Sequence, residues 1–241
     1  MLKLSMSISS NQSGVAILYI LIAITLFAAL GYVFMQSMSS TNPSQLTEEE
    51  ARVYAQDVLS YANRLNRGVQ RAMSKGTCSE NDISFYLDSN DSLSAYEHTP
   101  EVDDTCKVFS ESGGTITWLP APPSVNDGSE WIFTGDNRIA ELESDAPGTG
   151  NDLTAFLPNL DREVCIQINE LLRITNPNNL PPVENDNVVY AEFIGSFNTS
   201  TYLQTSGDEL NGQTEGCFEA NQIDSVNADG TFHFYTVLIA R

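Results

Sequence analysis

The chain has 241 residues, and its 32 acidic and 11 basic residues give a formal net charge of −21. Such an anionic field repels nucleic acids and anionic membrane surfaces, so direct nucleic-acid binding is not expected. Residues 76–241 hold 28 acidic and five basic residues, whereas residues 47–75 hold four acidic and five basic ones. The acidity therefore belongs to the distal part of the chain.

An uncharged, mainly aliphatic run extends from Val15 to Met35. As a helix it would span roughly 30 Å, about the thickness of one hydrocarbon core, so it is long enough to cross a membrane. No charged residue lies between Lys3 and Glu48, which favours a cytoplasmic amino terminus and an extracytoplasmic location for the bulk of the chain.

A long amphipathic helix is predicted from Thr47 to about Met73. TEEE at 47–50 is a capping box with acidic residues in the first turn, and Arg64, Arg67, Arg71 and Lys75 near the end complement the helix dipole. Apolar residues recur at spacings of three and four, which predicts one buried face that packs on the domain's own sheet. They are Ala51, Tyr54, Val58, Tyr61, Leu65, Val69 and Ala72.

Four cysteines occur, at Cys78, Cys106, Cys165 and Cys217. There is no CxxC pair and no neighbouring histidine, which favours two disulfides over a metal site and indicates an oxidising compartment. Three connectivities are possible. We expect the first cysteine to pair with the second and the third with the fourth, because each such pair brackets a block that reads as self-contained.

Residues 76–241 are predicted to form one β-rich domain of the α+β class with a mainly antiparallel sheet. Turn signals predict two hairpins, 107–109 with 115–119 through SESGG, and 131–134 with 138–142 through GDN. Further strands are expected at 188–197 and 231–240, the latter apolar enough for the middle of the sheet. One internal helix is expected near residue 161, with an apolar face of Leu160, Val164, Ile168, Leu171 and Leu172.

The amino-terminal region resembles the type IV pilins and the pseudopilins of type II secretion systems. The features that carry the resemblance are a short leader ending in Gly14, an apolar helix starting at Val15, its amphipathic continuation and a strand-rich domain with paired cysteines. In that family, a prepilin peptidase cuts after the glycine, the new amino terminus is methylated and the apolar helices pack into a filament core.

The resemblance implies a leader at 1–14 cleaved between Gly14 and Val15, a stem helix at 15–75 and a globular domain at 76–241. It implies the prepilin peptidase and other pilin-like subunits as partners. The expected location is the inner membrane with an extracytoplasmic domain, and then an extracellular or periplasmic filament.

Tyr19 stands where the family usually has a glutamate, five residues after the cut. That carboxylate is thought to meet the charged amino terminus of a neighbouring subunit, and an ammonium group in hydrocarbon needs such a partner. A large tip-type minor pseudopilin also lacks the glutamate. We therefore expect a minor subunit, at or near a filament tip.

Two other interpretations of the apolar run remain open. It could be a plain anchor for an extracytoplasmic binding domain that does not polymerise. It could also be a discarded signal peptide, because Ser37 and Ser39 flank Met38 in a small-x-small pattern, although the run is longer than the usual apolar region of a signal peptide.

The sequence gives no indication of an enzyme. It contains no GxSxG, HExxH, P-loop or GxGxxG motif. Of its two histidines, His98 lies in a polar acidic loop, and His233 lies in the terminal predicted strand, where a structural role is expected. No catalytic residue and no required cofactor is predicted.

Calcium is the one ion for which the sequence offers candidate sites. Three predicted loops combine Asn, Asp and Glu, whose oxygens suit Ca²⁺, although none has EF-hand spacing and turn chemistry alone also explains these residues. The candidate ligands are Asn126, Asp127, Glu130, Glu184, Asp186 and Asp229.

Overall fold

The computed structural model describes residues 19–20, 22–25, 46–75, 78–142, 150–185, 188–197, 201–203, 207–221 and 230–241. The chain divides into two compact units, Met1–Gln45 and Leu46–Arg241. The predicted apolar helix lies almost wholly outside the described residues, of which 19–20 and 22–25 are helical. Among the helices within the described ranges, none is both long and apolar enough to cross a membrane.

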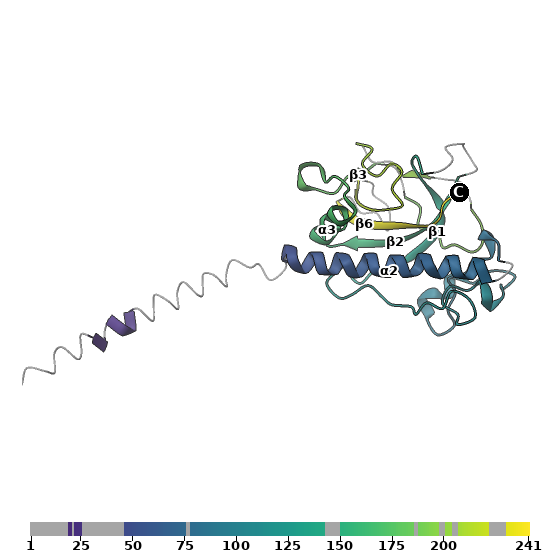
Figure 1. The fold of residues 1–241 in the computed structure, drawn as a ribbon, viewed down its shortest axis with the longest axis horizontal. Helices are drawn as coiled ribbons and strands as arrows, with labels where there is room; N and C mark the ends of the chain where they lie inside the picture. Colours follow the sequence, from purple (N-terminus) through teal and green to yellow (C-terminus); the bar gives the residue numbers. More distant parts are fainter. Residues whose placement is uncertain are drawn as a thin grey trace, which may run out of the picture. The chain divides into compact units, whose positions relative to one another are not determined.

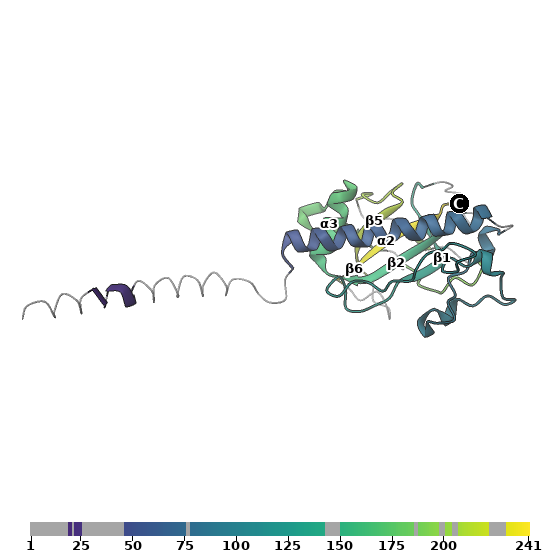
Figure 2. The same cartoon turned by 60° about the horizontal axis from the view of Figure 1, so that its bottom comes forward.

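The helix α2 (Glu48–Lys75) confirms the predicted amphipathic helix. Its capping box is formed, since the backbone N–H of Glu50 donates to Oγ1 of Thr47 and the Glu50 carboxylate accepts from the Thr47 backbone N–H. Its buried face contains Ala51, Ala55, Val58, Tyr61, Ala62, Leu65, Gly68, Val69 and Ala72. This face packs on the domain's own sheet and on α3 (Arg162–Leu172), as Figures 1 and 2 show.

The unit Leu46–Arg241 contains a six-stranded mixed sheet in the order β3-β5-β6-β2-β1-β4. The four central strands pair antiparallel, as predicted, while β3 and β4 add parallel edges. The strands are β1 (Ile132–Ile139), β2 (Asp152–Leu160), β3 (Val183–Glu184), β4 (Thr201–Leu203), β5 (Glu215–Ala220) and β6 (Thr231–Ile239). Short 3-10 helices are η1 (Glu80–Asp82), η2 (Asp91–Tyr96), η3 (Asp104–Cys106) and η4 (Pro177–Asn179).

Both faces of the central strands are covered. On one face, Phe234 and Leu238 of β6 join the cluster that includes the buried stripe of α2. On the other face, Tyr235 and Val237 join a second cluster that includes Leu210 and other apolar residues of the segments between α3 and β5. Burial on both faces explains why β6 is almost continuously apolar, and it places this strand in the middle of the sheet, as predicted.

The first predicted hairpin is wrong. Residues 107–119 form a tight turn, in which the backbone N–H of Ile116 donates to the Val108 carbonyl, but neither arm is a strand of the sheet. Thr115 has a φ of 61°, which interrupts the extended conformation, and three prolines follow at 120, 122 and 123. Proline cannot donate to a ladder, so the second arm cannot continue as a central strand.

The second predicted hairpin is also wrong, because GDN lies inside the continuous strand β1. The register of β1 against β2 shifts between Thr134 and Asn137, which marks a bulge rather than a turn. A Cβ on Gly135 would lie 2.9 Å from ring atoms of Phe193 and Phe197. The glycine therefore allows two aromatic rings to approach the strand closely, which a local turn signal cannot reveal.

The strand predicted at 188–197 is not formed, and four strands, the short β3 and β4 together with β2 and β5, were not predicted. Residues 188–197 lie beside β1 as an irregular segment, held by the Phe193 backbone N–H on the Phe133 carbonyl. The side chain of Asn137 takes up both the N–H and the carbonyl of Val189, in place of regular strand pairing. The missed strands β2 and β5 are buried on both faces or short, so neither shows a clear two-residue alternation.

We expect Gly114→Ala to lower the free energy of unfolding by about 1–3 kcal/mol through overpacking. The added Cβ would lie 2.9 Å from the carbonyl oxygen of Gly68, where the turn crosses α2, and backbone atoms cannot move away by changing rotamer. Urea denaturation of the full chain measures the change. Gly207→Ala is the control, because there the nearby atoms are the end of the flexible Glu209 side chain. Equal stabilities of the two variants would contradict this account.

Candidate functional site

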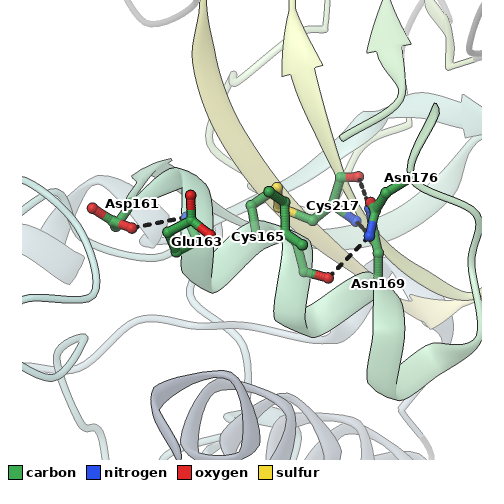
Figure 3. The surroundings of a disulfide bond; sticks show 7 residues. Asp161, Glu163, Cys165, Asn169, Asn176 and Cys217 are labelled. Atoms are coloured by element: carbon green, nitrogen blue, oxygen red, sulfur yellow. Dashed lines mark hydrogen bonds between the residues drawn. A yellow bond between two sulfur atoms is a disulfide. The ribbon is translucent and has the colours of Figure 1, made fainter. Parts of the chain in front are cut away.

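Both predicted disulfides are confirmed. Cys78 is bonded to Cys106 with an S–S distance of 1.99 Å, and Cys165 is bonded to Cys217 with an S–S distance of 1.93 Å. The first bond ties the segment that follows α2 to η3. The second ties α3 to β5, as Figure 3 shows. Each bond therefore fixes one segment of the chain to an element of the domain.

A buried asparagine reinforces the second disulfide. Asn169 is fully buried on α3, and its side-chain amide donates to the Cys217 carbonyl and accepts from the Cys217 backbone N–H, both at 2.9 Å. The same amide donates to Oδ1 of Asn176 at 2.8 Å (Figure 3). This contact cannot be predicted from the sequence, because nothing in the helical pattern distinguishes Asn169 from an exposed polar residue.

The loop at 126–130 uses its oxygens internally. Oδ1 of Asn126 accepts from the Gly128 backbone N–H, and Oδ1 of Asp127 accepts from the Ser129 backbone N–H. The other carboxylate oxygen of Asp127 accepts from Asn159 at 3.1 Å, while Glu130 is exposed. The turn is therefore maintained by its own hydrogen bonds, which is the turn-chemistry interpretation of this sequence.

Asn126 and Glu184, which belong to two of the candidate calcium loops, lie near the same end of the sheet. Asn126 bridges to Leu160, Leu160 pairs with Phe232, Phe232 with Glu219, and Glu219 with Val183. With neighbouring strands about 4.8 Å apart, the first and last of these positions are roughly 19 Å apart. Asn126 and Glu184 therefore lie beside different strands and are too far apart to bind one ion together.

Glu184 is buried at the end of β3, next to Asn185, whose side-chain oxygen accepts from Asn221 at 2.9 Å. Asp186 and Asp229 lie outside the described residues. Across the part of the chain that the structure describes, no group of three or more His, Cys, Asp or Glu side chains is arranged to hold a metal ion.

His233 has a structural environment. It is fully buried on β6, with Nδ1 3.0 Å from the Tyr190 hydroxyl and Nε2 2.7 Å from the Thr231 hydroxyl. Its ring stacks on Phe218 with the ring centroids 5.6 Å apart. Both ring nitrogens are therefore engaged, as expected for a histidine that supports the fold.

His98 lies at a junction between two segments that are far apart in the sequence. It is only 6% exposed, and its ring packs edge-on against Phe193 at a centroid distance of 6.0 Å. A Cβ on Gly195 would lie 3.0 Å from Nδ1 of His98, and the Gly195 carbonyl accepts from the Asn81 side chain at 2.6 Å. The imidazole thus fills the contact between the loop that the first disulfide closes and the segment 188–197.

A polar cleft with a volume of about 470 Å³ opens beside this junction. Its lining includes Asp82, His98, Glu101, Asp103, Ile194 and Gly195. Hydrogen bonds from Ser79 lower the pKa of Asp82, and hydrogen bonds from Thr105 lower that of Asp103, so both carboxyls are ionised at neutral pH. The cleft therefore has the character of an anionic surface depression rather than of a nucleophilic or metal centre.

Lys107 balances part of this charge. Its ammonium group lies 2.6 Å from Glu101 and 2.8 Å from Asp104, and the residue is buried. Burial alone would lower the pKa of Lys107, but the hydrogen bonds and charges of the two carboxylates outweigh it and raise the pKa. Lys107 thus stays charged, and its two ion pairs hold residues 101–107 together.

The processing residues of the sequence analysis, Gly14 and Val15, lie outside the described residues. Comparisons of the chain with protein-family models, with curated proteins and with solved structures found no significant match. The functional assignment therefore depends on the residues and geometry of this chain.

We expect Asn169→Ala to lower the free energy of unfolding by about 1–3 kcal/mol, because it leaves the buried N–H and carbonyl of Cys217 without their side-chain partner. Chemical denaturation with the disulfides intact measures the change. Asn63→Ala is the matched control, since Asn63 is exposed on α2 and donates only within its own helix. A loss as small as that of the control would show that the Asn169 amide does not hold β5.

We also expect His98 to make the fold less stable in mild acid. Burial lowers the pKa of His98 below its ordinary value, and the charge of Asp82 offsets this only in part. The unfolded chain then binds a proton before the folded chain does, so stability is full above about pH 6.5 and falls as the pH drops toward the lowered pKa.

The measurement is the free energy of unfolding of wild type and of His98→Gln at about pH 7.5 and about pH 5. The difference between the two proteins isolates His98 from the carboxyl groups that titrate at lower pH. Wild type should lose more stability between these two pH values than the variant does. Parallel losses would show that His98 does not titrate in this window.

Proposed function

We propose that the chain is a minor pilin-like or pseudopilin-like subunit of a type IV pilus-like or type II secretion filament. The observation that carries the proposal is the geometry of α2, which buries one apolar face on the sheet and leaves its opposite face exposed along its length. In the sequence, this helix follows the apolar run from Val15 to Met35. A stem built in this way suits a subunit displayed by packing of its amino-terminal helix.

The disulfides support a location outside the cytoplasm. Both bonds lie in the unit Leu46–Arg241, and such bonds persist in oxidising compartments. In the proposed topology the inner membrane holds the apolar run before assembly, and the acidic domain is displayed outside for filament initiation, adhesion or contact with secreted cargo. The proposed role is structural, with no catalytic step.

Tyr19 supports a minor position in the filament. A phenol cannot provide the charge that a carboxylate gives to a neighbour's amino terminus. A subunit without that charge is best placed at a tip, where it has neighbours on one side only.

A second candidate function is a membrane-anchored binding protein that does not polymerise. The observation that favours it is the anionic cleft beside His98, whose volume of about 470 Å³ falls within the range of small-molecule sites. The two functions differ in whether the leader is removed at Gly14.

The deciding experiment is the amino terminus of the protein from its own cells, measured by intact mass and terminal peptide sequencing. We expect a chain that starts at a methylated Val15. Gly14→Leu should abolish this processing, whereas Gly31→Leu, the same substitution within the apolar run, should leave the cut in place. A start at Met1 would favour the anchored binding protein, and a start near Ser40 would indicate a secreted one.

A further inference from the structure

Three basic residues form one row on the exposed face of α2. Arg67, Arg71 and Lys75 are spaced by four residues, so they lie above one another on the helix, and all three are exposed. We call this row the basic stripe. It lies on a unit, Leu46–Arg241, whose carboxylates outnumber its cations by 32 to ten.

Several other cations of the unit are in ion pairs. Lys107 contacts Glu101 and Asp104, Arg162 contacts Glu163 at 2.8 Å, and Arg241 contacts Glu80 at 2.8 Å. Within the described ranges, no carboxylate lies within ion-pair distance of the basic stripe. A positive surface left open on such an acidic protein is available to an anionic partner.

The helix dipole accounts for only part of the stripe. Cations stabilise a helix near its carboxyl end, and this effect falls off within the last turn. Lys75 is the last residue of α2, but Arg67 lies about two turns earlier. The position of Arg67 and its alignment with Arg71 therefore call for another explanation.

The chain also carries an acidic segment at residues 88–104, of which Glu101 and Asp104 are already paired with Lys107 and the other four carboxylates have no ion pair among the described residues. Residues 88–104 contain six exposed carboxylates and no lysine or arginine. These residues, which we call the acidic segment, include Asp88, Asp91, Glu97, Glu101, Asp103 and Asp104. No ion pair joins the acidic segment to the basic stripe within one chain, over the part that the structure describes.

We propose that the basic stripe of one subunit docks on the acidic segment of a second copy of this chain. The two surfaces differ, so the contact is heterologous and is not two-fold symmetric. The proposal deepens the filament function by naming a contact between subunits, and it rests on that function.

Anionic lipid is the weaker occupant. The apolar run joins α2 at its amino-terminal end, where Glu48, Glu49 and Glu50 occupy the first turn. The basic stripe begins about 28 Å further along the helix axis, from a rise of about 1.5 Å per residue. The end of α2 that continues toward the apolar run thus presents negative charge, which anionic head groups repel.

Carbodiimide coupling of the full chain in detergent tests the contact, because this reagent joins a lysine amine to a carboxylate that touches it. An equal mixture of unlabelled and nitrogen-15-labelled protein separates contacts between copies from contacts within one copy. We expect isotopically mixed peptides that join Lys75 to the acidic segment. Lys75 coupled only within one copy, or not coupled at all, would overturn the proposal.

Self-association measured by sedimentation velocity provides the second test. The double variant Arg67→Gln/Arg71→Gln should weaken association by roughly three- to thirty-fold at low salt, from two surface ion pairs. Arg162→Gln/Arg173→Gln removes the same charge from α3 and its carboxyl end, and it should associate like wild type. High salt should remove the difference between the two variants.

Equal association of the two variants, or a monomeric wild type, would overturn the docking. So would a stripe variant that associates normally but no longer binds vesicles of phosphatidylglycerol, since lipid would then be the occupant. A chain that starts at Val15 yet stays monomeric would refute this contact and leave the filament function standing. A chain that starts at Met1 and associates through the basic stripe would refute the filament function and leave this contact standing.

Discussion

The packing of the α2 apolar stripe on the sheet is the contact on which the rest of this structure depends. It buries one complete face of a 28-residue helix and one face of the central strands in the same cluster. Because α2 is fixed in this way, its opposite face points outward, and the turn at 107–116 packs against the buried face where Gly114 comes close to the Gly68 carbonyl. The charged residues on the outer face of α2 are therefore exposed at the surface.

Side-chain amides complete the hydrogen bonding where regular strand pairing stops. Asn169 takes both backbone groups of Cys217, and Asn137 does the same for Val189. Asn66 and Gln70 of α2 donate to the carbonyls of Val237 and Leu238, just beyond Thr236, where the pairing of β6 with the first residue of β5 stops. Buried backbone groups must find partners, so these amides allow an irregular sheet to be covered on both faces without loss of stability.

The distribution of charge connects this fold to its proposed role. The formal net charge is −21, and the exposed carboxylates of the acidic segment and the exposed cations of the basic stripe belong to separate parts of the chain. A contact between these two surfaces is therefore heterologous and is not two-fold symmetric.

The sequence by itself determined the features that depend on local chemistry. These are the capped helix from 48 to 75, the helix that starts after Asp161 and the terminal strand. Each follows from periodicity, capping or composition within a short window. For the same reason, the turn signals at SESGG and GDN could be read from the sequence, but it could not be read that the first has no strands beside it and that the second lies inside β1.

Tertiary structure alone decided the features that depend on contacts between distant segments. Gly135 serves the approach of Phe193 and not a turn, Asn169 serves Cys217, and His98 fills a junction with Gly195. Asn126 and Glu184, two of the candidate calcium ligands, are separated by the widths of the strands between them. The physical reason is that burial and hydrogen-bond satisfaction are set by the partner across the sheet, whose position no local pattern specifies.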